Sequence, residues 1–480
     1  MPMNPARIVH PGFWFGKTDI EDARKWAKMG VGGFCVYGGT REEIETFCKE
    51  MRGLSPYAEI FISADYEDGL GRWIKGAELL PSNMAIGASG EEELAMKKGL
   101  ITARQARSIG INWIFAPVVD LASDPENPIV NTRAFGKDPM LVTRLAMAFM
   151  SGLSQGGTLN TLKHFPGHGD TSKDSHLELP FISKSFDKLF DSDLVPYKTL
   201  LKFADSIMVG HLLIPAIDDE NPSSLSEKTI RGILRQKLNY KGCVVTDALL
   251  MKAIGDQKEA ALKALKAGAD ILLAPSDPYE IIDYLNQLIK EDYTWKEHFI
   301  NAVATQEILL TKNRKVEIRT PEYAFFKSSY SMDAAPRCIT EFGEENVLKK
   351  ENSLSYMEID CKSDFESTPF AKQLKANGFK LAPYTGGECK NLLIVSFSGY
   401  ASFKGFANFT KEQKKTVENA LTKAKNSAFV SFGSPFVHSD FKTKAQYHLL
   451  AYCANEDFQI FCADALCGKA KVTGKAPIEI

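Results

Sequence analysis

The sequence predicts an α/β protein in which a (β/α)8 TIM barrel is followed by a smaller αβα sandwich domain. Short apolar runs alternate with helical patterns through the first 315 residues, and polar residues follow several of these runs. The apolar periodicity then fades before a second α/β stretch begins. We therefore expect a catalytic barrel over residues 1–315, a linker over 316–337 and an αβα domain over 338–480.

The strands expected in the barrel are short and apolar. They lie at residues 8–15, 31–37, 59–64, 112–116, 159–162, 206–209, 243–246 and 270–273. The helical patterns between them lie at residues 21–29, 42–51, 91–109, 141–152, 186–203, 228–238 and 257–267. Pro196 marks a break in the fifth of these helices. Strands joined by crossover helices run parallel, and eight such units favour a closed barrel over an open sheet.

The C-terminal part of the sequence predicts a second, smaller domain of the same class. Residues 392–397 and 428–432 are interpreted as buried strands, and residues 458–462 as a third strand. Between the first two, Thr410 and Gln413 form a capping-box pattern that opens a helix. The turn at residues 431–435 is interpreted as structural rather than catalytic.

Composition excludes several classes of partner. The net charge of −2 leaves no basic surface for nucleic acid, and no apolar run reaches the roughly 18 residues of a membrane span. The N-terminus lacks a basic segment followed by an apolar run. The nine cysteines are scattered and form no C-x-x-C pair, which favours free thiols in a reducing compartment. We expect a cytoplasmic monomer with no nucleic-acid or membrane partner.

Polar residues gather where the predicted strands end. They are Asp65, Glu67, Asp120, Lys163, His164, His211, Asp247, Ser276 and Asp277. Active sites of (β/α)8 barrels are built at the C-terminal ends of the strands, so we expect these side chains to converge. An ordinary loop residue is an equally good interpretation of any one of them, but the set as a whole favours a site.

The stretch at residues 163–176 is the richest in titratable groups, with three of the eight histidines of the chain. Its proline and two glycines interrupt regular structure, so it can bring such groups to a substrate as a loop. A polar surface loop without chemistry is the plainer interpretation. Metal-ligand chemistry is present in His164, His168, Asp170 and His176. Their spacing lacks the His-x-x-x-His of a helical zinc site, so we do not expect a metal.

Asp247 and the Asp174–His176 pair offer the chemistry of glycosidic cleavage. Asp247 ends an apolar strand and can present a nucleophile below an anomeric carbon. His176 can give and take a proton near neutrality, and Asp174 can orient its ring and favour its charged form. On spacing alone, a local turn contact explains Asp174 and His176 equally well.

These residues resemble a known family. The run Lys-His-Phe-Pro-Gly-His-Gly-Asp-Thr at 163–171, with Asp-Ser-His at 174–176 and Leu-Pro at 179–180, is similar to the signature of family 3 glycoside hydrolases. More narrowly, it resembles the bacterial β-N-acetylglucosaminidase branch in its two-domain form. Further similar stretches lie at residues 127–128, 133–136, 208–211, 222–226 and 246–251.

The resemblance implies retaining, exo-acting hydrolysis of a terminal β-linked N-acetylglucosamine, from peptidoglycan or muropeptide fragments, without a cofactor. Asp247 would form the glycosyl-enzyme, and His176, oriented by Asp174, would be the acid and then the base. The small carbohydrate substrate would be held by Asp65, Arg133, Lys163 and His164.

The chain departs from the family pattern close to Asp65. The family usually carries Asp-x-Glu-Gly-Gly with a sugar-binding arginine eight residues after the aspartate. Here the run at residues 65–72 is Asp-Tyr-Glu-Asp-Gly-Leu-Gly-Arg, so the arginine comes after seven. Arg72 either fills the same role or points elsewhere.

Three other functions remain open at this point. One is a β-N-acetylglucosaminide phosphorylase on the same scaffold, since a histidine repels incoming phosphate less than a carboxylate base does. Another is a glycosidase for a different sugar, although such relatives usually lack the histidine loop. The third is a catalytically silent sugar-binding protein, which would have no need of a nucleophile.

Overall fold

The computed structural model describes residues 4–480 except 172, 176, 315–327, 346, 349–352, 365–366 and 402–403. The chain forms two compact units. The first comprises Met1–Leu79, Ala95–Asp120 and Thr143–Lys327, and the second comprises Leu80–Leu94, Leu121–Val142 and Ser328–Ile480. The second unit therefore includes two segments from the range predicted to form only the barrel. Hydrophobic periodicity indicates secondary structure but not which elements pack together, so the sequence could not show this.

The strands of the first unit pair in parallel within three groups. One sheet contains β2 (Gly12–Trp14), β3 (Gly33–Tyr37), β4 (Phe61–Ala64) and β5 (Trp113–Ile114). A second contains β6 (Thr161–Phe165), β7 (Ser206–Val209) and β8 (Cys243–Thr246), and β1 (Val9–His10) pairs with β9 (Leu272–Leu273). Parallel bridges from Trp113 to Leu159 and from Val245 to Ile271 link these groups. The first unit is a TIM-barrel-like α/β fold.

Each of the eight predicted strand positions holds strand residues, with two differences. The first predicted strand is interrupted between β1 and β2 at Pro11, which has no N–H to donate to a neighbouring strand. The fifth predicted strand, β6, continues to Phe165, so Lys163 and His164 lie within the strand rather than after it. Trp113 fills part of the interior, and its indole N–H lies 2.8 Å from the Thr161 hydroxyl and 3.2 Å from that of Ser206.

Helices cover the first unit on its outside, and most lie where the sequence predicts them. They are α1 (Ile20–Met29), α2 (Arg41–Leu54), α4 (Glu92–Ser108), α5 (Pro139–Gly156), a π-helix (Lys228–Lys237), α8 (Gln257–Ala267), α9 (Pro278–Glu291) and α10 (Trp295–Arg314). The helix predicted at 186–203 is instead two, α6 (Phe186–Asp191) and α7 (Val195–Leu200). Pro196 lies in the first turn of α7, where its missing N–H is not needed.

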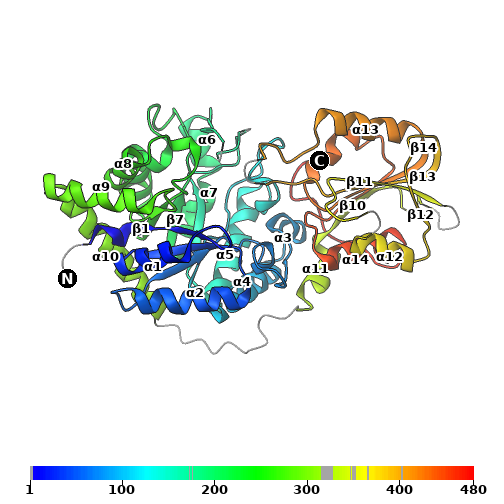
Figure 1. The fold of residues 1–480 in the computed structure, drawn as a ribbon. Helices are drawn as coiled ribbons and strands as arrows, with labels where there is room; N and C mark the ends of the chain where they lie inside the picture. Colours follow the sequence, from blue (N-terminus) through cyan, green and yellow to red (C-terminus); the bar gives the residue numbers. More distant parts are fainter. Residues whose placement is uncertain are drawn as a thin grey trace. The chain divides into compact units, whose positions relative to one another are not determined.

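The second unit is built on a six-stranded sheet. Its strand order is β10 (Thr340–Gly343), β15 (Tyr447–Leu450), β14 (Ala424–Ser431), β13 (Cys389–Ser396), β11 (Leu354–Ile359) and β12 (Leu381–Pro383). Only β10 runs antiparallel to its neighbour among these pairs. Figure 1 shows α13 (Lys411–Thr422) on one side of this sheet, and α12 (Pro369–Ala376) and α14 (Glu456–Leu466) on the other.

The second unit confirms three sequence predictions and corrects two others. The strands predicted at residues 392–397 and 428–432 are β13 and β14. The capping box between Thr410 and Gln413 opens α13 as expected. The strand predicted at 458–462 is wrong, because these residues lie in α14, whose N-terminus is capped by Asn455. A five-residue apolar run fits a strand and a buried helix equally well. The predicted linker contains most of a helix, α11 (Tyr330–Cys338). Residues 316–327 of the predicted linker lie outside the described residues.

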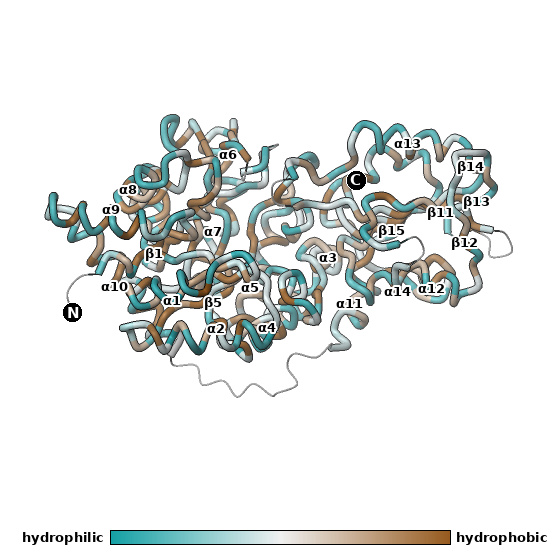
Figure 2. Tube along the Cα trace, viewed as in Figure 1, coloured by the Kyte–Doolittle hydropathy of each residue, from teal (hydrophilic) through white to brown (hydrophobic). Residues whose placement is uncertain are grey.

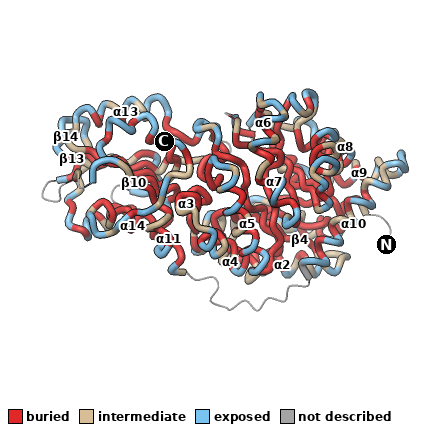
Figure 3. The backbone as a smooth tube through the Cα atoms, turned by 180° about the vertical axis from the view of Figure 1, so that it is seen from behind, coloured by how far each residue is buried: buried red, intermediate tan, exposed pale blue. Residues whose placement is uncertain are grey.

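Polarity and burial follow the layers of each unit. Figure 2 shows β13 and β14 among apolar residues, whereas α13 is largely hydrophilic. Figure 3 shows buried residues inside both units and exposed residues along the outer faces of the helices. Among the described helices, none is both long enough and apolar enough to cross a membrane.

Candidate active site

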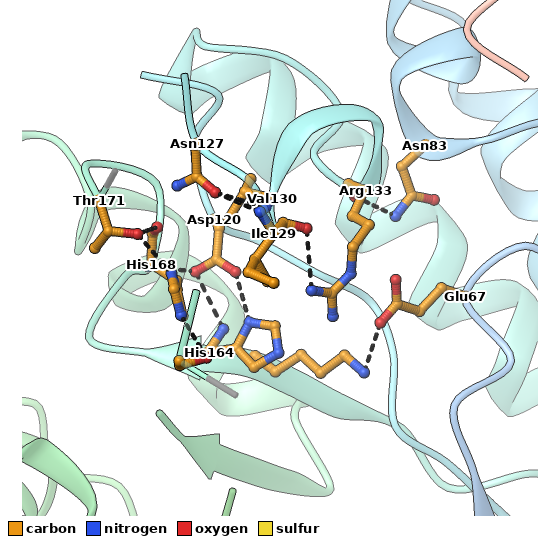
Figure 4. A network of polar contacts seen from close by, with 12 residues as sticks. Glu67, Asn83, Asp120, Asn127, Ile129, Val130, Arg133, His164, His168 and Thr171 are labelled. Carbon is orange, nitrogen blue, oxygen red and sulfur yellow. Dashed lines mark hydrogen bonds and ion pairs between the residues drawn. The ribbon is translucent and has the colours of Figure 1, made fainter. Parts of the chain in front are cut away.

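Lys163 joins the ends of two strands of the first unit through ion pairs. Its ammonium lies 2.7 Å from Asp65 Oδ1 and 2.7 Å from Glu67 Oε1, both in the segment after β4. Figure 4 shows the contact to Glu67. The Lys163 side chain is only 2% exposed, whereas that of Asp65 is 25% exposed. Burial excludes a lone ammonium, so this lysine depends on the two carboxylates. The trio carries one net negative charge, and Asp65 is the member that solvent or a ligand can reach.

Asp120 is a second centre of polar contacts, and it receives hydrogen bonds from both histidines of the loop motif (Figure 4). Its Oδ2 lies 2.7 Å from His164 Nδ1, and its Oδ1 accepts the backbone N–H groups of His164 at 3.1 Å and His168 at 2.7 Å. Burial alone raises the pKa of Asp120. The charge and hydrogen bond of His164, together with those of His168, outweigh burial and hold this pKa below its usual value. Asp120 therefore stays ionised and fixes the orientation of the His164 ring.

The loop after β6 is braced internally by the His168 ring. His168 Nδ1 lies 3.1 Å from Thr171 Oγ1, and its Nε2 lies 3.2 Å from Ser175 Oγ. Asp174 is buried, and its backbone carbonyl accepts the N–H of Leu177 at 2.9 Å. His176 lies outside the described residues, so the structure places only Asp174 of the predicted proton-transfer pair.

Asp247 lies directly after β8 and is partly buried. Its backbone N–H donates to Val209 at 3.0 Å, and its Oδ1 accepts the N–H of Ala248 at 2.8 Å. The buried His211 supports the same turn: its Nε2–H donates to the Ala248 carbonyl at 3.1 Å, and its Nδ1 lies 2.6 Å from Ser224 Oγ. Strand pairing and a buried histidine thus fix the backbone that presents Asp247.

Tyr37, at the end of β3, shows that several of these strand ends face one interior. Burial raises its pKa well above the usual value, and the nearby Cys35 thiol and the carboxylates of Asp65 and Asp247 add to this shift. Two carboxylates far apart in sequence thus act on one hydroxyl. The Tyr37 ring stacks on Trp14 with centroids 4.6 Å apart. The carboxyl ends of the strands therefore combine carboxylates with an aromatic surface.

The two arginines predicted to bind substrate have separate surroundings. Arg72 is exposed and pairs with Asp68, which also lies 3.3 Å from the Lys98 ammonium. Arg133 belongs to the second unit. Its Nη1 donates to the Ile129 carbonyl at 3.3 Å, and its guanidinium lies 5.8 Å from the centre of the Tyr400 ring. These contacts hold Arg133 by its backbone neighbours and by an aromatic face.

The sequence missed two groups of this site. The sequence places Asp120 at a strand end but assigns it no role, and it does not single out Tyr37. Both act through contacts with residues from other strands, and no local pattern marks such contacts. Their only sequence signal is their position at the carboxyl end of a strand. Among the described residues, no group of three or more His, Cys, Asp or Glu side chains could hold a metal ion.

The chain matches the family model "Glycosyl hydrolase family 3 N terminal domain" over residues 17–306, which is more than half of its length. It therefore belongs to glycosyl hydrolase family 3 and is a glycoside hydrolase. The resemblance inferred from the histidine loop is confirmed. The matched range covers every candidate site residue described above.

Similar proteins carry related names. The chain is 31% identical over 315 residues to a β-hexosaminidase of Neisseria meningitidis serogroup B, covering 61% of this chain and 86% of that one. It is 36% identical over 237 residues to β-hexosaminidase A of Pseudoalteromonas piscicida, covering 45% of this chain and only 40% of that one. A family 3 β-N-acetylglucosaminidase structure from Paenibacillus sp. str. FPU-7 aligns over 99% of this chain and 98% of that one, with a TM-score of 0.86 and 25% identity.

A structure of a β-glucoside phosphorylase, BglX, aligns over 99% of this chain and 93% of that one, with a TM-score of 0.89 and 22% identity. This likeness concerns the fold alone. It shows that the scaffold of this chain is shared with a protein named for a different reaction, so the reaction has to be argued from the residues of the site.

Proposed function

We propose that the protein is a retaining exo-β-N-acetylglucosaminidase that releases terminal β-linked N-acetylglucosamine from peptidoglycan or muropeptide fragments. One observation carries this proposal: two carboxylates from different strand ends both raise the pKa of Tyr37. They are Asp247, which follows β8, and Asp65, which is paired with Lys163. The relatives named β-hexosaminidase and β-N-acetylglucosaminidase support the choice of sugar.

The proposed reaction has two steps. Asp247 attacks the anomeric carbon and forms a glycosyl-enzyme, while His176 protonates the departing glycosidic oxygen. His176 then removes a proton from water, which displaces Asp247 and releases the sugar with retained configuration. Asp174 orients the His176 ring and favours its protonated form before the first step.

The remaining predicted residues would bind the sugar before the reaction begins. Hydrogen bonds to its hydroxyl and acetamido groups are assigned to Asp65, Arg72, Arg133, Lys163 and His164. We further propose that the first unit is a closed (β/α)8 barrel and that residues 338–480 form an αβα sandwich. A monomer in the cytoplasm is the proposed form of the protein, and the nine free cysteines support a reducing compartment.

The assignment of Asp247 is tested by Asp247→Ala, assayed with an aryl N-acetyl-β-glucosaminide. Loss of a nucleophile is expected to lower kcat by about 10³-fold or more. Added azide should partly restore turnover and give the glycosyl azide of inverted configuration. Asp277→Ala is the matched control, because Asp277 follows the neighbouring β9 but only caps α9, through its bond to Glu280 N–H at 3.0 Å. An Asp247 variant as active as this control would sink the nucleophile assignment.

Product analysis in phosphate buffer separates hydrolysis from phosphorolysis. A hydrolase releases free N-acetylglucosamine at a rate that does not depend on phosphate. Formation of N-acetylglucosamine 1-phosphate in proportion to phosphate would assign the chain to the phosphorylases instead. Tight binding of the sugar without turnover would identify a sugar-binding protein.

A further inference from the structure

We propose that His168 is a positioning residue for proton transfer, whose ring ties Thr171 to Ser175 and so holds the loop segment that carries Asp174. This inference rests on the proposed function, in which Asp174 orients His176. The His168 ring contacts Thr171 at 3.1 Å and Ser175 at 3.2 Å, and Ser175 is the residue next to Asp174. His168, Thr171, Asp174 and Ser175 are all at most 2% exposed, so the brace is shielded from water.

The two contacts of the brace fit the neutral form of the imidazole. A neutral ring has one N–H donor and one bare nitrogen acceptor, whereas a protonated ring has two donors. Thr171 Oγ1 also lies 3.3 Å from the His168 carbonyl. If the Thr171 hydroxyl donates to that carbonyl, it accepts from Nδ1–H, and Ser175 donates to Nε2. Burial first, and the neighbouring His164 second, lower the pKa of His168 to about 4. The ring is therefore neutral through the range in which glycosidases usually work.

The groups around His168 explain how its position is fixed. Its backbone N–H donates to Asp120 Oδ1 at 2.7 Å, and Asp120 also holds the His164 ring. The charges that act on the His168 ring are those of His164, Asp120 and Asp247. Asp120 thus anchors both the sugar-binding His164 and the start of the proton-transfer loop. A displaced His168 would move the proton donor relative to a sugar that is still bound.

Gly167 and Lys184 limit the other movements of the loop. Gly167 has a φ of +133°, and a Cβ at this position would lie 2.8 Å from Asp193 Cβ. The Lys184 ammonium lies 2.9 Å from Asp193 and 3.7 Å from Asp170. These contacts fix the first half of the loop, up to Asp170. The His168 contact to Ser175 reaches its second half.

A positioning role in proton transfer predicts an effect that depends on the leaving group. The 2,4-dinitrophenolate of a dinitrophenyl glycoside leaves without protonation, whereas the phenolate of a phenyl glycoside needs a proton from the acid. The variants are His168→Phe, which keeps the ring shape without its hydrogen bonds, and Ser175→Ala, which removes only the second contact. We expect both to lose at least tenfold more kcat/KM on the phenyl substrate than on the dinitrophenyl substrate. His168→Gln, which keeps a donor and an acceptor, should recover part of this loss.

His10→Phe is the matched control for a fold that is merely weakened. His10 is also buried and neutral, with a pKa lowered to about 3 by burial, and its Nε2 lies 3.4 Å from Gln306. The His10→Phe variant should lower the melting temperature and change kcat/KM equally on the phenyl and dinitrophenyl substrates. Equal losses on both substrates for His168→Phe and Ser175→Ala, as for His10→Phe, would overturn the positioning role. Asp174→Ala separates a failure of this inference from a failure of the proposed function. If Asp174→Ala also shows no leaving-group dependence, the proposed Asp174–His176 pair is wrong, and the inference falls with it.

Discussion

The carboxyl ends of parallel strands differ in kind between the two units. In the first unit they carry charged groups in ion pairs and charged hydrogen bonds, as in Lys163 with Asp65 and His164 with Asp120. In the second unit they carry serines, such as Ser431, which donates to the Ser434 carbonyl at 2.9 Å, and the exposed carboxylate Asp360 after β11. Both locations suit a ligand site on topological grounds. The comparison teaches that topology selects the place, whereas buried charge selects the place that performs chemistry.

Buried histidines show the same contrast. His164 in the first unit lies against the ionised Asp120 at 2.7 Å. In the second unit, His438 Nδ1 lies 2.7 Å from His448 Nδ1, and the rings stack on Phe429 at 4.2 Å and on Phe342 at 4.4 Å. His448 Nε2–H donates to the Ala445 carbonyl, so its Nδ1 accepts from His438. A histidine beside a carboxylate can carry charge in a reaction, whereas this pair acts as packed aromatic rings.

The largest expected effect comes from removing Asp120. Asp120→Ala leaves the His164 ring and the backbone N–H groups of His164 and His168 without their acceptor. We expect kcat/KM on an aryl N-acetyl-β-glucosaminide to fall by about 10²-fold or more, since misplacing a binding residue by about 1 Å has an effect of that size. The comparison predicts no such loss for Asp360→Ala at the end of β11, although Asp360 also accepts two side-chain bonds, from Ser398 and Gln413.

Steady-state rates and melting temperatures of Asp120→Ala and Asp360→Ala, measured side by side, test this contrast. Both variants should melt at a lower temperature than the wild type, because each removes a hydrogen-bonded carboxylate. Equal losses of activity would show that buried charge does not distinguish the two sets of strand ends.

A smaller effect is expected on stability in acid. Burial is the main cause that lowers the pKa of His448 to about 4 and the pKa of His438 well below its usual value. The unfolded chain therefore binds more protons than the folded chain between pH 6.5 and about 4, and the free energy of unfolding falls as the pH falls through this window. Each such histidine contributes a slope of up to about 1.4 kcal/mol per pH unit.

Urea unfolding between pH 7 and pH 4.5 measures this slope. The double variant His438→Phe/His448→Leu replaces both partners by apolar side chains, so neither imidazole is left without the other. Its unfolding free energy should depend less steeply on pH than that of the wild type, with activity at pH 7 unchanged. An unchanged slope would mean that the pair is protonated in the folded chain, contrary to the contrast with His164.

Much of the first unit could be predicted from the sequence, because its strands are short apolar runs separated by capped helices. The same reasoning placed Asp65 and Asp247 at strand ends, and both act on Tyr37. The helix over residues 458–462 could not be separated from a strand, because a short apolar run has no decisive period. The shared role of Asp120 could not be predicted either, since His164 lies 44 residues further along the chain and only the paired strands bring them together.

The smallest expected effect belongs to Ser398, which follows β13 in the second unit. Its hydroxyl donates to Asp360 Oδ2 at 2.6 Å, while Gln413 donates to Asp360 Oδ1 at 2.7 Å and the Lys404 ammonium lies 3.9 Å from Oδ2. Because Asp360 keeps these other two partners, Ser398→Ala should cost only about 1 kcal/mol of unfolding free energy. Activity on the aryl glycoside should stay at the wild-type level. A tenfold loss of kcat/KM with an unchanged melting temperature would mean that the serines of the second sheet take part in the reaction, and the division between charged and hydroxyl-bearing strand ends would have to be abandoned.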